Sequence, residues 1–334
     1  MKAVQYLGPE NVSFAQVPAP EPPPGFCRVK VAYAGICGGD LNIFAGTHPR
    51  AKAPLIPGHE FSGVLDHDVK DLKKGTPVAV FPLISCGDCT PCRTGNSHVC
   101  NTLKLIGIDV DGGMGEYVIV PEDTLVPLPA GIDLKVGALI EPIAVAVHNI
   151  RETGYRPGDN ALVIGAGPIG LCIALVLKHF GAQGIVVSES DEARLALAKD
   201  MGFETINPLK EDLIAFSLAK TGGDGFDRVY DCAGVAAVAE VLFDLVRVKG
   251  EVIIVACYKK PTEFNFFKGH AKEISISFTR VYRRDCYPIA ANLAGIDPNF
   301  AKMISHCCKP EEAKEAFDLA RTPGSGAVKI LFEF

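Results

Sequence analysis

The second half of the chain alternates apolar runs with helical patterns. Buried strands are predicted at 161–164, 184–188, 228–231 and 251–255, and helices at 170–180 and 192–201. Strands that alternate with helices of about ten residues form βαβ units, whose strands lie parallel in one sheet. The pattern therefore predicts an α/β region with a parallel sheet.

The chain up to about residue 146 has a different texture. It is rich in Pro and Gly and carries short β-type runs such as 28–33 and 77–81. Short strands at close spacing, broken by turn residues, predict a mostly antiparallel or barrel-like domain. After residue 288 two helices are expected at 289–294 and 310–320, followed by a strand at 327–332. That tail could complete the sheet of the first domain.

Length and composition narrow the class of protein. At 334 residues the chain exceeds what one hydrophobic core usually supports, so two domains are expected. A net charge of -6 and the lack of a dense Lys/Arg cluster argue against nucleic acid or an anionic membrane as a partner. The longest apolar stretch, 171–177, is too short to span a bilayer, and the N-terminus has no signal-peptide core. The cytoplasm is therefore the expected location.

A glycine-rich hexapeptide follows the first predicted strand of the α/β region and opens its first helix. Its G-x-G-x-x-G glycines are Gly165, Gly167 and Gly170, with Pro168 and Ile169 before the last. The first glycine permits a tight turn, the second lets a pyrophosphate approach the backbone, and the third lets helix and strand pack closely. In this context the motif predicts a dinucleotide site at a helix N-terminus, and a purely structural turn is the alternative.

An acidic residue, Glu189, ends the second strand of this region. A carboxylate there can accept hydrogen bonds from the adenosine ribose hydroxyls and repels a 2′-phosphate, which favours NAD. Arg194 could cover the adenine face, although a nearby Arg is also how an NADP site begins. The alternative for Glu189 is an ordinary surface carboxylate in an acidic run.

Four of the twelve cysteines lie close together in the sequence. Cys86, Cys89, Cys92 and Cys100 have the spacing C-x2-C-x2-C-x7-C, with Gly, Pro and Asn between them. In a reducing compartment such a group is a metal site rather than a set of disulfides, and four thiolates form a closed, structural zinc site. An iron–sulfur cluster is the alternative, but the spacing differs from the common ferredoxin forms. His98 lies inside this lobe and is expected on the surface.

A second group of potential ligands lies in two glycine-rich turns. Cys37 follows Gly35-Ile36, and His59 with Glu60 follows Gly58; Glu141 could add another oxygen. A mixed donor set that leaves a position for water or substrate is typical of catalytic zinc. A satisfied core histidine is the alternative for His59, and spacing alone does not decide between the two.

These motifs together resemble the zinc-containing medium-chain dehydrogenase/reductase superfamily, from end to end. The segment from Glu141 to His148 is similar to the polyol branch, which includes sorbitol, butanediol and threonine dehydrogenases. The resemblance implies a GroES-like, mostly-β catalytic domain at 1–147 and 285–334, and a doubly wound Rossmann domain at 148–284. It also implies two zinc ions per chain, bound NAD, and a homodimer or homotetramer.

The resemblance assigns a role to each group of ligands. Cys37, His59 and Glu60 would bind the catalytic zinc, with Glu141 beside it, directly or through water. The four-Cys group would bind a structural zinc. The zinc would act as a Lewis acid on a secondary alcohol of a polyol, sugar phosphate or sugar acid, which then passes a hydride to NAD.

The chain departs from the family pattern at the proton relay. Family members usually carry Ser or Thr two residues after the zinc-binding Cys, and often a His three further on, where this chain has Gly39 and Asn42. Glu60, Glu141 and His48 are the remaining candidates for proton transfer. The family also places an Arg near the substrate; Arg283 is the better match, and Arg280 is the reserve.

Three other functions remain open from the sequence. A threonine dehydrogenase would use the same ligands on an amino-acid substrate. The missing relay hydroxyl also leaves room for an NAD-binding relative that has lost catalysis. A zinc-ribbon nucleic-acid binder is disfavoured by the acidic net charge.

Overall fold

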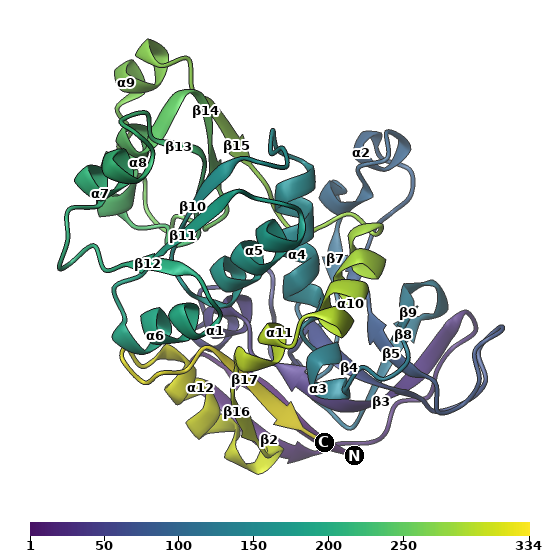
Figure 1. Ribbon diagram of the computed structural model, residues 1–334. Coiled ribbons are helices and arrows are strands. Elements are labelled where there is room, and N and C mark those ends of the chain that lie inside the picture. The colour runs from purple at the N-terminus through teal and green to yellow at the C-terminus, as the bar shows by residue number, and fades with distance from the viewer. The chain divides into compact units, whose positions relative to one another are not determined.

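The computed structural model describes residues 1–334, and contacts between Cα atoms divide the chain into two compact units. Unit 1 consists of Met1–Ala144 and Arg283–Phe334, and unit 2 consists of Val145–Tyr282. The predicted domain limits at 147 and 285 lie within a few residues of these positions. Each unit has its own main sheet (Figure 1).

Unit 1 is built mainly from short antiparallel strands. They are β1 (Lys2–Gly8), β2 (Asn11–Gln16), β3 (Phe26–Gly35), β4 (Glu60–Leu65), β5 (Pro77–Val80), β6 (Leu83–Ile84), β7 (Lys104–Leu105), β8 (Tyr117–Pro121), β9 (Leu125–Pro127), β16 (Ile304–Cys308) and β17 (Lys329–Glu333). The main sheet has the order β16-β17-β3-β4-β5-β9, with β8 also paired to β3. Only β16 and β17 pair in parallel. The expectation of a mostly-β domain is confirmed.

The helices of unit 1 are short. They are α1 (Gly38–Phe44), α2 (Thr90–Arg93), α3 (Leu134–Gly137), the first turns of α4 (Ile140–Arg151), α10 (Cys286–Ile296), α11 (Asn299–Lys302) and α12 (Ala313–Arg321), with 3-10 turns at Ser97–Val99, Glu122–Thr124 and Pro310–Glu312. Because Gly and Pro interrupt this half of the chain so often, only α4 and α10 exceed ten residues.

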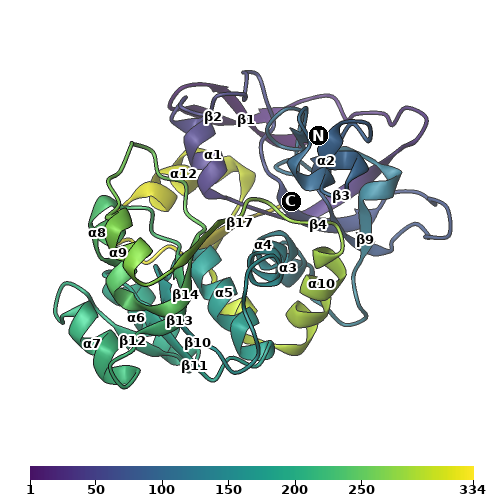
Figure 2. The same ribbon diagram turned by 90° about the horizontal axis from the view of Figure 1, so that it is seen from above.

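The C-terminal segment returns to the sheet of the N-terminal part. β17 pairs with the end of β3, and α12 lies beside α1 (Figure 2). The buried ring of Phe317 lies 5.3 Å from that of Phe44 and 6.3 Å from that of Phe332, measured between centroids. The predicted closing strand is therefore confirmed. Its parallel neighbour β16 is not predicted, because its residues are only exposed or half-buried and show no apolar run.

Unit 2 contains one parallel sheet. Its elements are β10 (Asn160–Ile164), α5 (Pro168–His179), β11 (Gly184–Ser188), α6 (Glu192–Asp200), β12 (Glu204–Ile206), α7 (Leu213–Lys220), β13 (Phe226–Asp231), α8 (Ala236–Leu245), β14 (Val246–Ile254), α9 (Phe266–Ala271) and β15 (Ser275–Phe278). The strand order is β12-β11-β10-β13-β14-β15, with every pair parallel. Numbered along the unit this is 3-2-1-4-5-6, the doubly wound order expected from the sequence.

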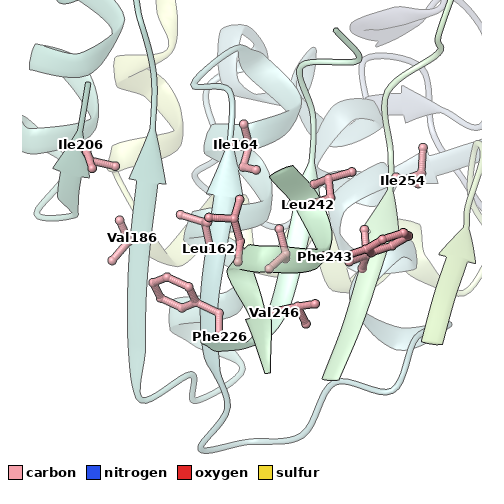
Figure 3. Packing of buried hydrophobic residues seen from close by; sticks show 12 residues of the cluster. Leu162, Ile164, Val186, Ile206, Phe226, Leu242, Phe243, Val246 and Ile254 are labelled. Carbon is pink, nitrogen blue, oxygen red and sulfur yellow. The ribbon is translucent and has the colours of Figure 1, made fainter. Parts of the chain in front are cut away.

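The apolar runs of these strands form the core of unit 2. Leu162 and Ile164 of β10 pack with Phe226 of β13 and with Leu242 and Phe243 of α8 (Figure 3). Because both faces of a parallel sheet are covered, its central strands read as continuous apolar runs, which is why they are predictable. No helix of the structure is long and apolar enough to cross a membrane.

Candidate metal centres and dinucleotide site

The four cysteines of the lobe converge on one point. The Sγ atom of Cys89 lies 3.4 Å from that of Cys92 and 3.7 Å from that of Cys100, and Cys100 lies 3.5 Å from Cys86. A tetrahedron of thiolates at the usual Zn–S distance of about 2.3 Å has S···S edges of about 3.8 Å. The observed spacing therefore fits a four-coordinate ion, as the sequence predicts.

Backbone N–H groups of the lobe favour the thiolate form of two of its four cysteines. N–H groups of Asp88 and Cys89 lower the pKa of Cys86, and the N–H of Cys86 lowers that of Cys100 to about 6. Burial and the neighbouring Cys89 instead raise the pKa of Cys92 to about 12. Four negative thiolates repel one another, so all four can ionise together only around a cation. His98, expected on the surface, is instead buried in the turn Ser97–Val99, but it is not part of the sulfur group.

The second predicted group also comes together. Cys37 is the residue before α1, and Glu60 begins β4, opposite Gly35 in the register of β3 and β4. One ligand atom each of Cys37, His59 and Glu60 lies within 4.8 Å of the others. His59 and Glu60 are only 5% and 1% exposed. Three donors of types S, N and O in a shielded position suit a zinc ion.

Asp40 fixes the turn that carries Cys37. Its Oδ2 atom accepts the N–H of Cys37 at 2.8 Å, and its Oδ1 atom lies 3.8 Å from Nδ1 of His59. Asp40 is fully buried, and these two facing atoms have no hydrogen-bond partner. A carboxylate that faces one ring nitrogen of a histidine leaves the other free for a metal, as is common for metal-binding histidines. Asp40 lies in the same glycine-rich turn as Cys37, but its position in the sequence did not indicate a role for it.

The charges in this site favour a cation. Burial raises the pKa of the Cys37 thiol, and the neighbouring Glu60 raises it further. Burial opposes protonation of His59, but Asp40 and Cys37 outweigh it and raise its pKa well above the usual value. Both shifts show a site that is rich in negative charge and shielded from water. A divalent cation would satisfy this donor set, so the residues fit the metal that the sequence predicts.

Sequence reasoning missed one charged member of the site, Lys329 on β17. Its ammonium group pairs with the Oε2 atom of Glu60 and donates to the carbonyl oxygen of Ile36 at 3.2 Å. Lys329 is 2% exposed. Burial opposes its charge, but Glu60, Cys37 and Glu141 raise its pKa above the usual value. The only signal in the sequence is a Lys within the otherwise apolar strand 327–332.

Glu141 and His48, the other residues predicted for this site, are not among the three grouped ligands. Glu141, in the first turn of α4, is 8% exposed, and its charge acts on both His59 and Lys329. It is not among the three residues with ligand atoms within 4.8 Å. His48 is half-buried, and its Nδ1 atom accepts the N–H groups of Arg50 and Ala51 at 3.3 and 3.2 Å. Burial lowers the pKa of His48 most, the charge of Arg50 lowers it further, and the charge of His59 makes a smaller contribution in the same direction.

The two arginines predicted near a substrate differ in position. Arg283 begins the C-terminal part of unit 1, and its Nε atom lies 3.7 Å from Asp285. Arg280 is exposed and belongs to unit 2. At the relay position, a Cβ added to Gly39 would lie 3.6 Å from Cε1 of His59. That is an ordinary contact, so the missing hydroxyl is not imposed by lack of space.

The glycine-rich turn has the geometry that its sequence predicts. Gly165 has a φ of +100°, which a residue with a side chain rarely adopts. Gly167 is the residue before α5, with Pro168 and Ile169 in its first turn. A Cβ on Gly170 would overlap the carbonyl oxygen of Gly165, so only glycine lets the helix approach the turn this closely. The N–H groups at the start of α5 are placed to bind an anion.

Glu189 lies against this turn. Its Oε2 atom accepts the N–H of Ala166 at 2.7 Å, and its Oε1 atom accepts the N–H groups of Ser190 and Asp191 at 2.7 and 2.9 Å. A cavity of about 520 Å³ opens beside it at the ends of β10, β11 and β13, with Gly165, Glu189 and Ala233 in its lining. Arg194 on α6 also lies near the turn, since a Cβ on Gly167 would lie 4.0 Å from its Nη1 atom. Carboxyl ends of strands at a switch in strand order are where doubly wound sheets bind nucleotides.

Two family models match the chain, one in each unit. Residues 23–130 match the alcohol dehydrogenase GroES-like domain, and residues 168–295 match the zinc-binding dehydrogenase model, which extends 13 residues past the end of unit 2 at Tyr282. The two matches follow the division of the fold into a mostly-β part and a doubly wound part.

Individual proteins support the same relationship. A 2-dehydro-3-deoxy-L-galactonate 5-dehydrogenase of Pseudoalteromonas atlantica is 36% identical over 84% of both chains. A sorbitol dehydrogenase of Halalkalibacterium halodurans is 34% identical, over 99% of this chain and 98% of its own. A crystal structure of an alcohol dehydrogenase from Escherichia coli CFT073, complexed with NADH, is 30% identical and has a TM-score of 0.91, covering 100% and 99% of the two chains.

Proposed function

Because the chain belongs to the zinc-binding alcohol dehydrogenase family, and is therefore an NAD(P)-linked, zinc-dependent oxidoreductase, we propose that it oxidises a secondary alcohol of a polyol, sugar phosphate or sugar acid with NAD. The observation that carries the proposal is the shielded cluster of Cys37, His59 and Glu60. A zinc ion held there would act as a Lewis acid that lowers the pKa of the substrate alcohol, and bound NAD would accept the hydride.

The chain's own residues would divide the work as follows. Cys37, His59 and Glu60 supply the ligands, and Asp40 orients the first two through its contacts with the Cys37 N–H and His59. Glu141 lies near enough to act on the charge of His59 and would stand beside the ion, directly or through water. The four-Cys lobe would hold a second, structural zinc, because its sulfur spacing fits a closed tetrahedral site.

The proton of the alcohol needs a route other than a relay hydroxyl, since Gly39 has no side chain. Glu60 is already paired with Lys329 and is therefore a poor acceptor. His48 accepts backbone N–H groups at Nδ1, so its neutral ring carries its proton on Nε2. Burial and Arg50 lower its pKa, which keeps the ring neutral near pH 7. With Nδ1 engaged and the proton on Nε2, His48 is also a poor acceptor, and we therefore favour Glu141 for proton transfer.

The type of substrate follows from the donor set and from the relatives. Oxygen ligands make zinc a harder centre, which suits a substrate that chelates through adjacent hydroxyl oxygens. The two relatives described above are named for a sugar acid and a polyol. Arg280, Arg283 and Arg284 could supply cations for a substrate that carries an acid or phosphate group; the first is in unit 2 and the others are in unit 1.

The direct test is a comparison of kcat/KM across alditols, sugar acids, sugar phosphates, vicinal diols and L-threonine, each with NAD and with NADP. We expect the highest kcat/KM for a sugar acid, sugar phosphate or polyol with NAD. Threonine as the best substrate would replace this proposal with the amino-acid alternative. No turnover of any member would favour a relative that binds NAD without catalysis.

The preference for NAD is expected to depend on Glu189. A 2′-phosphate would meet this carboxylate, whose charge repels it. Glu189→Gln removes the charge and also one of the two oxygens that accept backbone N–H groups, so thermal unfolding must show that the turn is kept. The ratio of kcat/KM for NAD to that for NADP should then fall at least about tenfold, or about 1.4 kcal/mol. Glu192→Gln is the matched control, because Glu192 lies three residues on and pairs with Lys210. An unchanged ratio in the Glu189 variant would contradict this role.

We also propose that the chain assembles with copies of itself in the cytoplasm. β15 forms one edge of the parallel sheet and so presents unpaired backbone groups, and Phe278 on it and Phe266 on α9 are 75% and 68% exposed. An open edge with exposed aromatic side chains is a surface that proteins usually cover. No disulfide joins any of the twelve cysteines, whereas small proteins of oxidising compartments commonly carry disulfides. Sedimentation equilibrium would reveal the assembly, and a monomer at all concentrations would exclude it.

A further inference from the structure

The ion pair between Lys329 and Glu60 is unusual because one of its partners is a proposed metal ligand. Both side chains are almost fully buried, at 2% and 1% exposure. The Glu60 carboxylate uses its Oε2 atom for Lys329 and belongs at the same time to the group formed with Cys37 and His59. The same negative charge is therefore within reach of two cations, one built into the chain and one brought by a metal.

The surrounding structure is built to hold this lysine. A Cβ on Gly35 would lie 2.5 Å from Oε2 of Glu60 and 3.4 Å from Cδ of Lys329, so the pair fills the space that this glycine leaves. The carbonyl oxygen of Ile36 accepts a second hydrogen bond from the ammonium group at 3.2 Å. The flanking residues of β17, from Ile330 to Phe332, are buried and apolar. Lys329 therefore cannot turn to solvent without disrupting the strand.

A buried carboxylate without a counter-charge is strongly unfavourable, whereas a paired one is tolerated. We propose that Lys329 is the internal counter-cation of Glu60, which lets the site fold before metal arrives and then competes with zinc for this carboxylate. The inference rests on the proposed zinc site at Cys37, His59 and Glu60, and concerns the metal-free protein and the affinity for zinc rather than the reaction.

Two consequences follow from charge compensation. Without the ammonium group, the metal-free protein would bury an uncompensated carboxylate and lose stability. Zinc would then meet a carboxylate without the ammonium group that competes for it, so it would bind more tightly. By linkage, zinc should stabilise such a variant more than it stabilises the natural chain. A residue that only filled space would not reverse its effect between the metal-free and zinc-loaded states.

The experiment compares Lys329→Met, which keeps most of the volume without the charge, with Lys329→Arg, which keeps the charge. Zinc affinity is measured by competition with a chromophoric chelator, and the unfolding temperature is measured with and without zinc. The variant Cys37→Ser, which lacks one ligand of this site, measures the zinc bound by the four-Cys lobe, and that amount is subtracted from the total. We expect Lys329→Met to bind zinc at this site at least about tenfold more tightly and to lose unfolding temperature mainly in the metal-free state. Lys329→Arg should stay closer to the natural chain in both measurements.

The double variant Glu60→Gln/Lys329→Met tests the mechanism itself. With Glu60 neutral, the two positions have no charge to compensate, so the metal-free protein should recover stability relative to Lys329→Met. Weaker or unchanged zinc binding in Lys329→Met would overturn the proposal, as would its failure to fold even with zinc supplied. If instead Cys37→Ser and the natural chain bind the same amount of zinc, the proposed zinc site fails, and with it the function.

Discussion

His59→Asn should lower kcat/KM for the preferred polyol or sugar acid by at least about 10³-fold while the protein remains folded. His59 is one of three donors that meet within 4.8 Å, and its Nδ1 atom faces Oδ1 of the buried Asp40 at 3.8 Å. Lewis-acid activation contributes several kcal/mol to such reactions, and each 1.36 kcal/mol is a factor of ten in rate. Asn cannot replace the ring nitrogen at this position. The same variant should contain about one zinc per chain rather than two.

The control for this result is His67→Asn, since His67 is half-buried in the same unit and is not among the grouped ligands. Its kcat/KM and zinc content should match those of the natural chain. Far-ultraviolet circular dichroism distinguishes loss of the site from loss of the fold. Normal activity in His59→Asn, or normal zinc content together with lost activity, would show that this histidine is not a metal ligand.

Gly170→Ala should destabilise unit 2 and abolish dinucleotide binding. The new Cβ would overlap the carbonyl oxygen of Gly165, so α5 would have to move away from the turn that it follows. Overpacking of this kind costs about 1–3 kcal/mol or more, and it separates the groups that bind the pyrophosphate. Thermal unfolding and titration with NADH, followed by its fluorescence, measure the two effects.

Gly167→Ala is the matched variant within the same turn. Gly167 has an ordinary φ of −70°, and a Cβ there would lie 4.0 Å from its nearest neighbour, Nη1 of Arg194. The loss of stability should therefore be about 1 kcal/mol or less. The Cβ would nevertheless stand where the pyrophosphate approaches the backbone, so the Kd for NADH should rise at least about tenfold. If the two variants lost stability equally, the separate roles given to these glycines would be wrong.

The features that could be predicted from the sequence are those that local patterns encode. Buried parallel strands read as apolar runs, a phosphate-binding turn needs glycines at fixed spacing, and four cysteines within a short segment have few alternatives to a metal. The apolar run of β17 made that strand predictable as well. The strands β12 and β15, with only three and four residues, were not predicted. Short edge strands carry too few positions to show a period.

The features that could not be predicted depend on contacts between distant segments. Glu60 and Lys329 are separated by 269 positions, and no local pattern joins them. The burial of His98 depends on how the lobe folds back on itself, and composition alone favoured the surface. The sequence also left the alternative of a core histidine open for His59, until the structure grouped one of its ring nitrogens with the ligand atoms of Cys37 and Glu60.

Removal and return of zinc test the central claim most directly. NADH formation from the preferred substrate is measured with the natural chain, with chain stripped of zinc by a chelator, and with the stripped chain after zinc is added back, while metal analysis follows the content. We expect activity to disappear as the site at Cys37, His59 and Glu60 empties, and to return in proportion to zinc bound there. Activity that survives complete removal of zinc would contradict the account.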